Sequence, residues 1–182
     1  MTAGIDSQIL IYAEMIPNKP RGKLPPERRQ HLKELRWRSK SLLKFLEEEI
    51  VVLPMVCVAE VLVPVPASRR GMIIGALTKR FNCRPLNLQA ASFAADLWAG
   101  YESEQPEHEE DQYDDRHVLR ADTLIIGTLK AAGVSTFYSH DRKCRTLAKR
   151  VLTHVLDIPK RDPKGNLFEK LEAAEDEDED EG

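Results

Sequence analysis

The chain has 182 residues, of which 42% are hydrophobic and 31% are charged, with a formal net charge of −3. This is the composition of an ordinary soluble protein with room for one domain and a sizeable core. No apolar run approaches the roughly 20 residues of a membrane span, and no secretory signal is visible, so we expect a cytoplasmic protein without membrane contact. Three cysteines at irregular spacing, with no Cys-x-x-Cys pair, argue against structural zinc.

The predicted elements alternate between strand and helix. We expect strands over 2–5, 50–53, 84–88, 134–139 and 151–156. We expect helices over 7–15, 25–49, 56–63, 67–80, 89–101, 117–132 and 142–149. This alternation predicts an α/β fold in which a central parallel sheet is covered by helices on both faces. Ligands bind such sheets beyond the carboxyl ends of the strands.

Charge is distributed unevenly along the chain. Residues 172–181 contain eight acids and no base, and a second acidic block over 102–115 also holds eight acids. Residues 19–44 carry ten Lys or Arg and two Glu. The long helix within this basic segment places leucines on one face and Arg28, Arg29, Lys33, Arg36 and Lys40 on the other. This face is either a solvated surface or an RNA-binding surface, and Trp37 either packs or stacks on a base.

Four acidic residues border apolar runs at places where an unused charge would be unfavourable. They are Asp6, Glu60, Asp122 and Asp141. Carboxylates resist burial without a partner, and Mg²⁺ and Mn²⁺ prefer oxygen ligands. If the four converge, a divalent cation is their natural partner. Each also has a simpler interpretation: Asp6 as a helix N-cap, Asp122 as a first-turn acid at the start of a helix, and Asp141 as a turn residue. Glu60 is the hardest to explain simply, because its flanks are apolar.

The sequences around these acids resemble the motifs of the PIN-domain nucleases, the family of the VapC-type toxins. The resemblance rests on four stretches in the family's order: Gly4–Ala13, Val58–Leu62, Arg120–Thr128 and Ser139–Arg142. Gln8 stands where Asn is usual, and Ser139-His140-Asp141-Arg142 resembles a motif that often reads Thr-Asn-Asp-Arg. The similarity covers roughly residues 2–157 and implies a PIN-like three-layer α/β/α fold.

The resemblance also implies an activity, namely hydrolysis of RNA phosphodiester bonds with Mg²⁺ or Mn²⁺. Asp6 and Asp122 would hold the metal directly, while Glu60 and Asp141 would complete the shell directly or through water. Ser7 would cap the following helix or orient a ligand carboxylate, and Arg142 would contact the substrate phosphate, with His140 as a further candidate. Toxins of this family usually form homodimers and are held inactive by a small antitoxin.

We accordingly expect a PIN-like nuclease domain over 1–157, containing the basic helical segment 18–49 and the acidic insert 102–116. A C-terminal extension over 158–171 and a disordered acidic tail over 172–182 would follow. The rival interpretations are a non-catalytic PIN-fold module that binds RNA or protein, and an aspartyl phosphatase or receiver. The phosphatase pattern needs a second aspartate at position 8, which is Gln8. The sequence leaves open whether RNA or single-stranded DNA is cut, and how many metal ions are bound.

Overall fold

The computed structural model describes residues 2–15, 24–102 and 113–160 of the chain, and for 102 and 113–119 the backbone alone. Five strands form one parallel sheet in the order β3-β2-β1-β4-β5. The strands are β1 (Thr2–Ile5), β2 (Ile50–Pro54), β3 (Asn82–Arg84), β4 (Thr136–Tyr138) and β5 (His154–Leu156). In the register, Gly4 lies opposite both Val52 of β2 and Phe137 of β4. The parallel sheet predicted from the alternation of elements is therefore confirmed.

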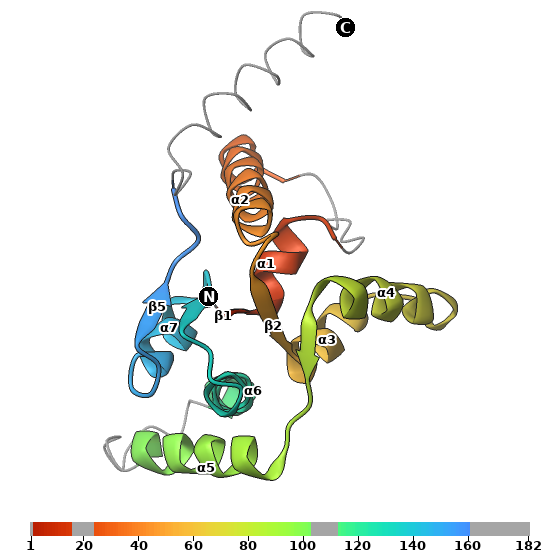
Figure 1. The fold of residues 1–182 in the computed structure, drawn as a ribbon. Helices are drawn as coiled ribbons and strands as arrows, with labels where there is room; N and C mark the ends of the chain where they lie inside the picture. Colours follow the sequence, from red (N-terminus) through yellow and green to blue (C-terminus); the bar gives the residue numbers. More distant parts are fainter. Residues whose placement is uncertain (1, 16–23, 103–112, 161–182) are drawn as a thin grey trace, which may run out of the picture.

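Helices cover the sheet from both sides. They are α1 (Ser7–Tyr12), α2 (Pro26–Phe45), α3 (Met55–Leu62), α4 (Ala67–Arg80), α5 (Leu88–Glu102), α6 (Tyr113–Ala131) and α7 (Arg142–Ala148). Helices α1 and α2 lie on one side of β1 and β2, and α6, with α5 outside it, lies on the other (Figure 1). None of the helices in the described ranges is long and apolar enough to cross a membrane.

The central strands are buried because both of their faces meet helices. Ala3, Ile5, Leu53 and Phe137 are fully buried, as expected for the apolar strands of a parallel sheet. Gly4 is needed for close packing, since a Cβ atom there would lie 2.6 Å from Cδ2 of Leu129 on α6. The absence of a side chain at Gly4 therefore leaves room for Leu129 of α6 against the central strand.

Most predicted elements have the predicted type, but several boundaries differ. The strand predicted over 84–88 lies earlier, at Asn82–Arg84, because pairing with β2 ends at Arg84 and Pro85 follows, which has no N–H to donate. The helix predicted from 117 begins earlier, at Tyr113, so the predicted acidic loop over 102–116 is helical at both of its ends. Residues 103–112 of that loop, and the extension and tail from 161 onward, lie outside the described residues.

Candidate metal-dependent active site

Asp6, the first acid of the site, lies where successive strands of the sheet begin to be added on the opposite side of β1. Strand β1 leads to α1 and then to β2 on one side, whereas β4 leads to α7 and then to β5 on the other. Such a switch point leaves a crevice beyond the carboxyl ends of the two central strands. Asp6 directly follows β1 and Asp141 follows β4 by three residues, so both lie at this edge.

Asp6 is both a helix cap and a buried acid. It is the N-cap of α1, and its Oδ1 accepts a hydrogen bond from the backbone N–H of Ile9 at 3.3 Å. Its Oδ2 accepts a hydrogen bond from the Ser139 hydroxyl. The side chain is only 4% exposed. Capping alone does not require that burial, because most N-cap side chains serve at the surface.

Asp141 is tied to Asp6 through Ser139. The Asp141 backbone N–H donates to Oγ of Ser139 at 3.0 Å, while the same hydroxyl donates to Asp6. Asp141 also caps α7, since its Oδ1 accepts from the N–H groups of Lys143 and Cys144 at 2.7 and 3.1 Å. A single buried serine thus couples two acids that are far apart in the sequence.

Asp122 is placed differently from the prediction. It lies in the interior of α6, nine residues after Tyr113, so the interpretation of Asp122 as a first-turn acid is wrong. The Cys144 thiol donates a hydrogen bond to its carboxylate. Helix α6 also contacts α3, the helix that carries the partly buried Glu60. These three acids therefore come from three helices: Glu60 lies on α3, Asp122 lies within α6, and Asp141 is the N-cap of α7.

The other three acids act electrostatically on Asp122, and Asp141 acts on Asp6. Burial, followed by repulsion from Asp141, Glu60 and Asp6, raises the pKa of Asp122 from 3.8 to about 7. Burial raises the pKa of Asp6 to about 6, against the hydrogen bonds from Ser139 and Ile9, and repulsion from Asp141 adds to it. Asp122 therefore lies within the electrostatic reach of all three other carboxylates.

The same acids also raise the pKa values of two cysteine thiols, Cys57 and Cys144. Burial raises the pKa of Cys57, and repulsion from Asp6, Glu60 and Asp122 raises it further. Burial likewise raises the pKa of Cys144, with Asp122 as the next contributor and Asp6 and Asp141 after it. These shifts place both cysteines beside the acids as neutral thiols rather than as reactive thiolates.

The acids do not form a ready coordination shell. Among the residues described, no group of three or more His, Cys, Asp or Glu side chains is arranged so that it could hold a metal ion. The donor chemistry nevertheless fits a hard cation, because the site gathers carboxylate oxygens whose mutual repulsion is left unbalanced. Mg²⁺ retains several waters and often contacts only one or two carboxylates, so a partly water-mediated arrangement suits these residues.

The structure also places the predicted substrate-binding residues. Ser7 is buried as the first residue of α1, and Arg142 is exposed as the first residue of α7. His140 is engaged: its Nδ1 lies 2.9 Å from Oδ1 of Asp157, and its ring meets Tyr12 edge to face at 5.9 Å. His31 of α2 lies 6.5 Å from the same ring, so the first half of α2 borders the site.

Three residues beside the site were not assigned a role from the sequence: Ser139, Asp157 and Tyr12. Ser139 had a signal, since it directly follows a strand and belongs to the fourth motif. Asp157 also had one, because it follows β5 as Asp6 follows β1. Burial opposes ionisation of Asp157, but hydrogen bonds from His140 and the Ile158 N–H, together with Arg145, lower its pKa overall. Asp157 thus acts as a stable anion that holds His140 and Arg145.

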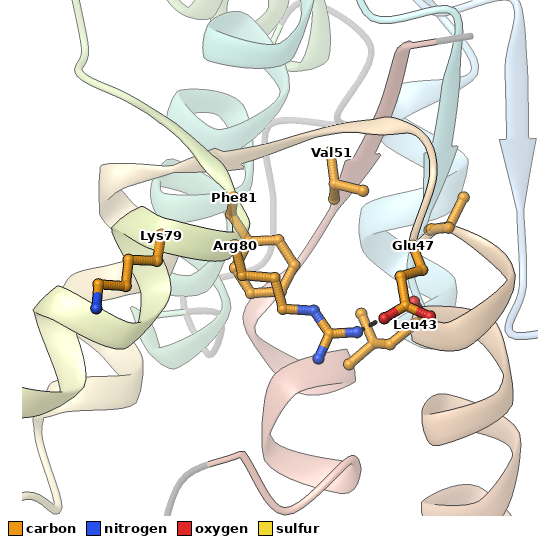
Figure 2. Close-up of a pocket in the computed structure, with 7 residues that line it drawn as sticks. Leu43, Glu47, Val51, Lys79, Arg80 and Phe81 are labelled. Atoms are coloured by element: carbon orange, nitrogen blue, oxygen red, sulfur yellow. Dashed lines mark hydrogen bonds between the residues drawn. The ribbon is translucent and has the colours of Figure 1, made fainter.

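A pocket of about 350 Å³ lies away from the acids, where α2 and α4 end. Figure 2 shows Arg80 extending toward Leu43 and Glu47, and Arg80 donates a hydrogen bond to the Leu43 carbonyl at 3.1 Å. Helices α2 and α4 lead into β2 and β3, so this pocket lies at the amino edge of the sheet. It is separate from the acidic site at the carboxyl edge.

Comparison with known proteins identifies the fold. No family model matches the sequence, and no curated protein matches it. The structure is similar to a chain in the crystal structure of VapBC2 from Rickettsia felis bound to a DNA fragment from their promoter. The match has a TM-score of 0.54 and 13% sequence identity, and it covers 87% of this chain and 100% of the other. The predicted PIN-like α/β fold is confirmed by this likeness.

Proposed function

We propose that the protein is a metal-dependent ribonuclease that hydrolyses RNA phosphodiester bonds with Mg²⁺ or Mn²⁺. The observation that carries the proposal is the gathering of acids: Ser139 joins Asp6 to Asp141, and repulsion from these two acids and Glu60 adds to burial in raising the pKa of Asp122 to about 7. Carboxylates whose pKa is strongly raised by burial and by neighbouring acids cluster at functional sites. A divalent cation at these oxygens would offset the repulsion.

Asp6, Glu60, Asp122 and Asp141 would hold the metal, which, when bound, supplies a water of lowered pKa and charge stabilisation at the phosphate. The remaining residues of the chain position these groups. Ser139 fixes the orientation of Asp6, and the amides at the start of α7 fix that of Asp141. Such hydrogen bonds around metal ligands keep them in the geometry that binds the ion. Ser7 lies next to Asp6 and would support its orientation.

Arg142 and the exposed bases of α2 would bind the phosphates of the substrate. Arg142 opens α7 next to Asp141, and His31 places the first half of α2 beside His140. Exposed guanidinium groups near the acids would suit a polyanion, since positive side chains attract the phosphate backbone while the acids would bind it only through a cation. This arrangement favours a nucleic acid over a small phosphate ester.

The proposal is tested by incubating a labelled RNA with the protein and Mn²⁺ and mapping the new ends. We expect cleavage by the wild type and none by Asp6→Asn or Asp122→Asn. Asp96→Asn is the matched control, because Asp96 is an exposed acid on α5. Equal activity in all variants would assign the cleavage to a contaminant. Single-stranded DNA of the same sequence tests the preference between the two nucleic acids.

The alternative is a non-catalytic PIN-fold module that binds RNA or a partner protein. It predicts RNA binding that is unchanged in Asp122→Asn and no cleavage with any divalent ion.

The VapBC2 structure is that of a complex on its promoter DNA. By analogy, we propose that this chain forms a homodimer and acts as the toxin of a pair with a small antitoxin. Co-expression with the protein encoded next to its gene, followed by copurification, tests this assignment.

A further inference from the structure

The first half of α2 presents positive charge that the described residues do not neutralise. Arg28 and Arg29 are exposed, and neither has an acidic partner in the described part of the chain. Further along the helix, Arg36 and Lys40 share Glu14, at 2.8 and 3.3 Å. Glu27 lies in the first turn of the helix and offsets part of the helix dipole, so the positive charge of this surface comes from the guanidinium groups.

The chain returns to this helix just before the acidic segment 172–182. Arg38 of α2 is buried and donates hydrogen bonds to the carbonyls of Ile158 and of Pro159, the latter at 3.2 Å. Ile158 is 1% exposed and belongs to the core. The last described residue, Lys160, is therefore held beside the middle of α2, and everything after it starts from that point.

The distances allow residues 172–182 to reach the basic end of α2. Eleven residues, 161–171, lie between Lys160 and Glu172, and an extended chain over these twelve steps spans up to about 40 Å. Arg38 and Arg28 are ten residues apart on one helix, which is about 15 Å. A tether this short gives an intramolecular effective concentration in the millimolar range. The eight acids and no base of 172–181 would meet Arg28 and Arg29 at that concentration.

We propose that the acidic segment 172–182 binds to the basic first half of α2 within the same chain. The positive surface and the negative segment are complementary in charge, and the hydrogen bonds of Arg38 hold Ile158 and Pro159, from which the chain continues to the segment, against the same helix. His31, on the same half of α2, lies beside His140, so this basic surface borders the acidic site. The bound segment would compete with a polyanion for Arg28 and Arg29, and this competition, unlike the binding itself, rests on the proposed function.

Paramagnetic relaxation in the full chain tests the binding. A spin label is attached through Gly182→Cys in a Cys83→Ser background, in which the two other cysteines, Cys57 and Cys144, are buried and unreactive. We expect broadening of the amide signals of residues 27–33 at about 50 mM salt, and its loss in about tenfold higher salt. The double variant Arg28→Gln/Arg29→Gln should also remove the broadening.

The matched control is Arg69→Gln/Arg84→Gln, which removes two exposed guanidinium groups from other elements. It should leave the broadening in place. The proposal would be overturned if the spin-labelled chain with Arg28 and Arg29 intact showed no broadening on α2. It would also be overturned if the broadening persisted in Arg28→Gln/Arg29→Gln. An amide spectrum that keeps its dispersion shows that each variant is folded.

Oligonucleotide binding without divalent metal tests the competition separately from cleavage. We compare the wild type with a full chain whose eight acids in 172–181 are replaced by Asn and Gln. The affinity for a fluorescent single-stranded RNA should rise about tenfold at about 50 mM salt, and the difference should shrink as salt increases. Broadening without any gain in RNA affinity would support binding of the acidic segment to α2 and would contradict its competition with RNA. If neither the wild type nor the neutralised chain bound RNA, the result would count against the proposed function instead.

Discussion

The Ser139 hydroxyl donates a hydrogen bond to Oδ2 of Asp6 and accepts one from the backbone N–H of Asp141. Ser139 lies just after β4 and Asp6 just after β1, so the bond crosses between the two strands at the switch point of the sheet. It joins the first and the fourth acid of the site through one fully buried side chain. The orientation of Asp6 therefore depends on a residue that is not itself an acid.

Replacing Ser139 by alanine should weaken metal binding without removing a carboxylate. Asp6 would lose its charge-stabilising donor, and the Asp141 N–H would lose its acceptor. We expect Mn²⁺ affinity to fall by about 10- to 100-fold and the free energy of unfolding to fall by about 1–3 kcal/mol. Isothermal titration with Mn²⁺ and urea unfolding measure the two effects. Ser135→Ala, at an exposed serine just before β4, is the control and should leave Mn²⁺ affinity unchanged.

Neutralising Asp122 should stabilise the metal-free protein and abolish its response to metal. Because burial and three acids raise the pKa of Asp122 to about 7, its charged form costs stability at pH 8. We expect Asp122→Asn to increase the free energy of unfolding by about 2–4 kcal/mol in EDTA. Millimolar Mn²⁺ should raise the melting temperature of the wild type and leave that of the variant unchanged. A wild type that does not respond to Mn²⁺ would contradict the metal site.

The metal-free protein should become more stable as the pH falls from 8 to 5. The pKa values of Asp6 and Asp122 are raised from 3.8 to about 6 and about 7. Between the ordinary and the raised values the folded state binds more protons than the unfolded state, so stability decreases as pH rises through this window. Thermal unfolding in EDTA at several pH values measures the slope. Asp122→Asn should flatten its upper part, and a slope of opposite sign would refute the two shifts.

Arg38 should be a structural arginine, in contrast to its exposed neighbours. Its guanidinium is buried and donates to two carbonyls after β5. We expect Arg38→Gln to lower the free energy of unfolding by about 2–4 kcal/mol, because one buried and one partly buried carbonyl lose a charged donor. Arg29→Gln, which replaces an exposed guanidinium on the same helix, should change it by less than about 0.5 kcal/mol. Equal effects in the two variants would show that the 158–160 segment is not held by Arg38.

Two helical glycines should respond in opposite directions to alanine. A Cβ atom at Gly127 on α6 would lie 2.5 Å from the Ala90 carbonyl oxygen and 2.9 Å from the Ala94 nitrogen, both in the backbone of α5. Gly127→Ala should therefore separate α5 from α6 and cost about 1–3 kcal/mol or more. At Gly75 on α4 a Cβ atom meets nothing within 4 Å, so Gly75→Ala should stabilise the protein by about 0.5–1 kcal/mol. Urea unfolding of both variants checks the contrast.

The sequence by itself determined the order and type of the elements, because hydrophobic periodicity and proline positions are local properties. It indicated the apolar strands β1 and β2, the two faces of α2 and the exact span of α4, 67–80. It also singled out Asp6 and Asp141, since an acid at or shortly after the end of a buried strand stands out in a parallel α/β pattern. The hydrophobic faces of helices and the ends of strands depend on residues that are close in the sequence, so they can be predicted without knowing the fold.

Only the tertiary structure decided which distant residues act on one another. Asp122 was expected at the start of a helix, yet it lies in the interior of α6, where packing against α3 and α7 brings it near Glu60 and Cys144. Arg38 has the same charge as Arg36, but the return of the chain after β5 buries one and leaves the other exposed. Burial and electrostatic repulsion depend on the distance in space between groups, and that distance is set by strand order and helix packing rather than by separation along the chain.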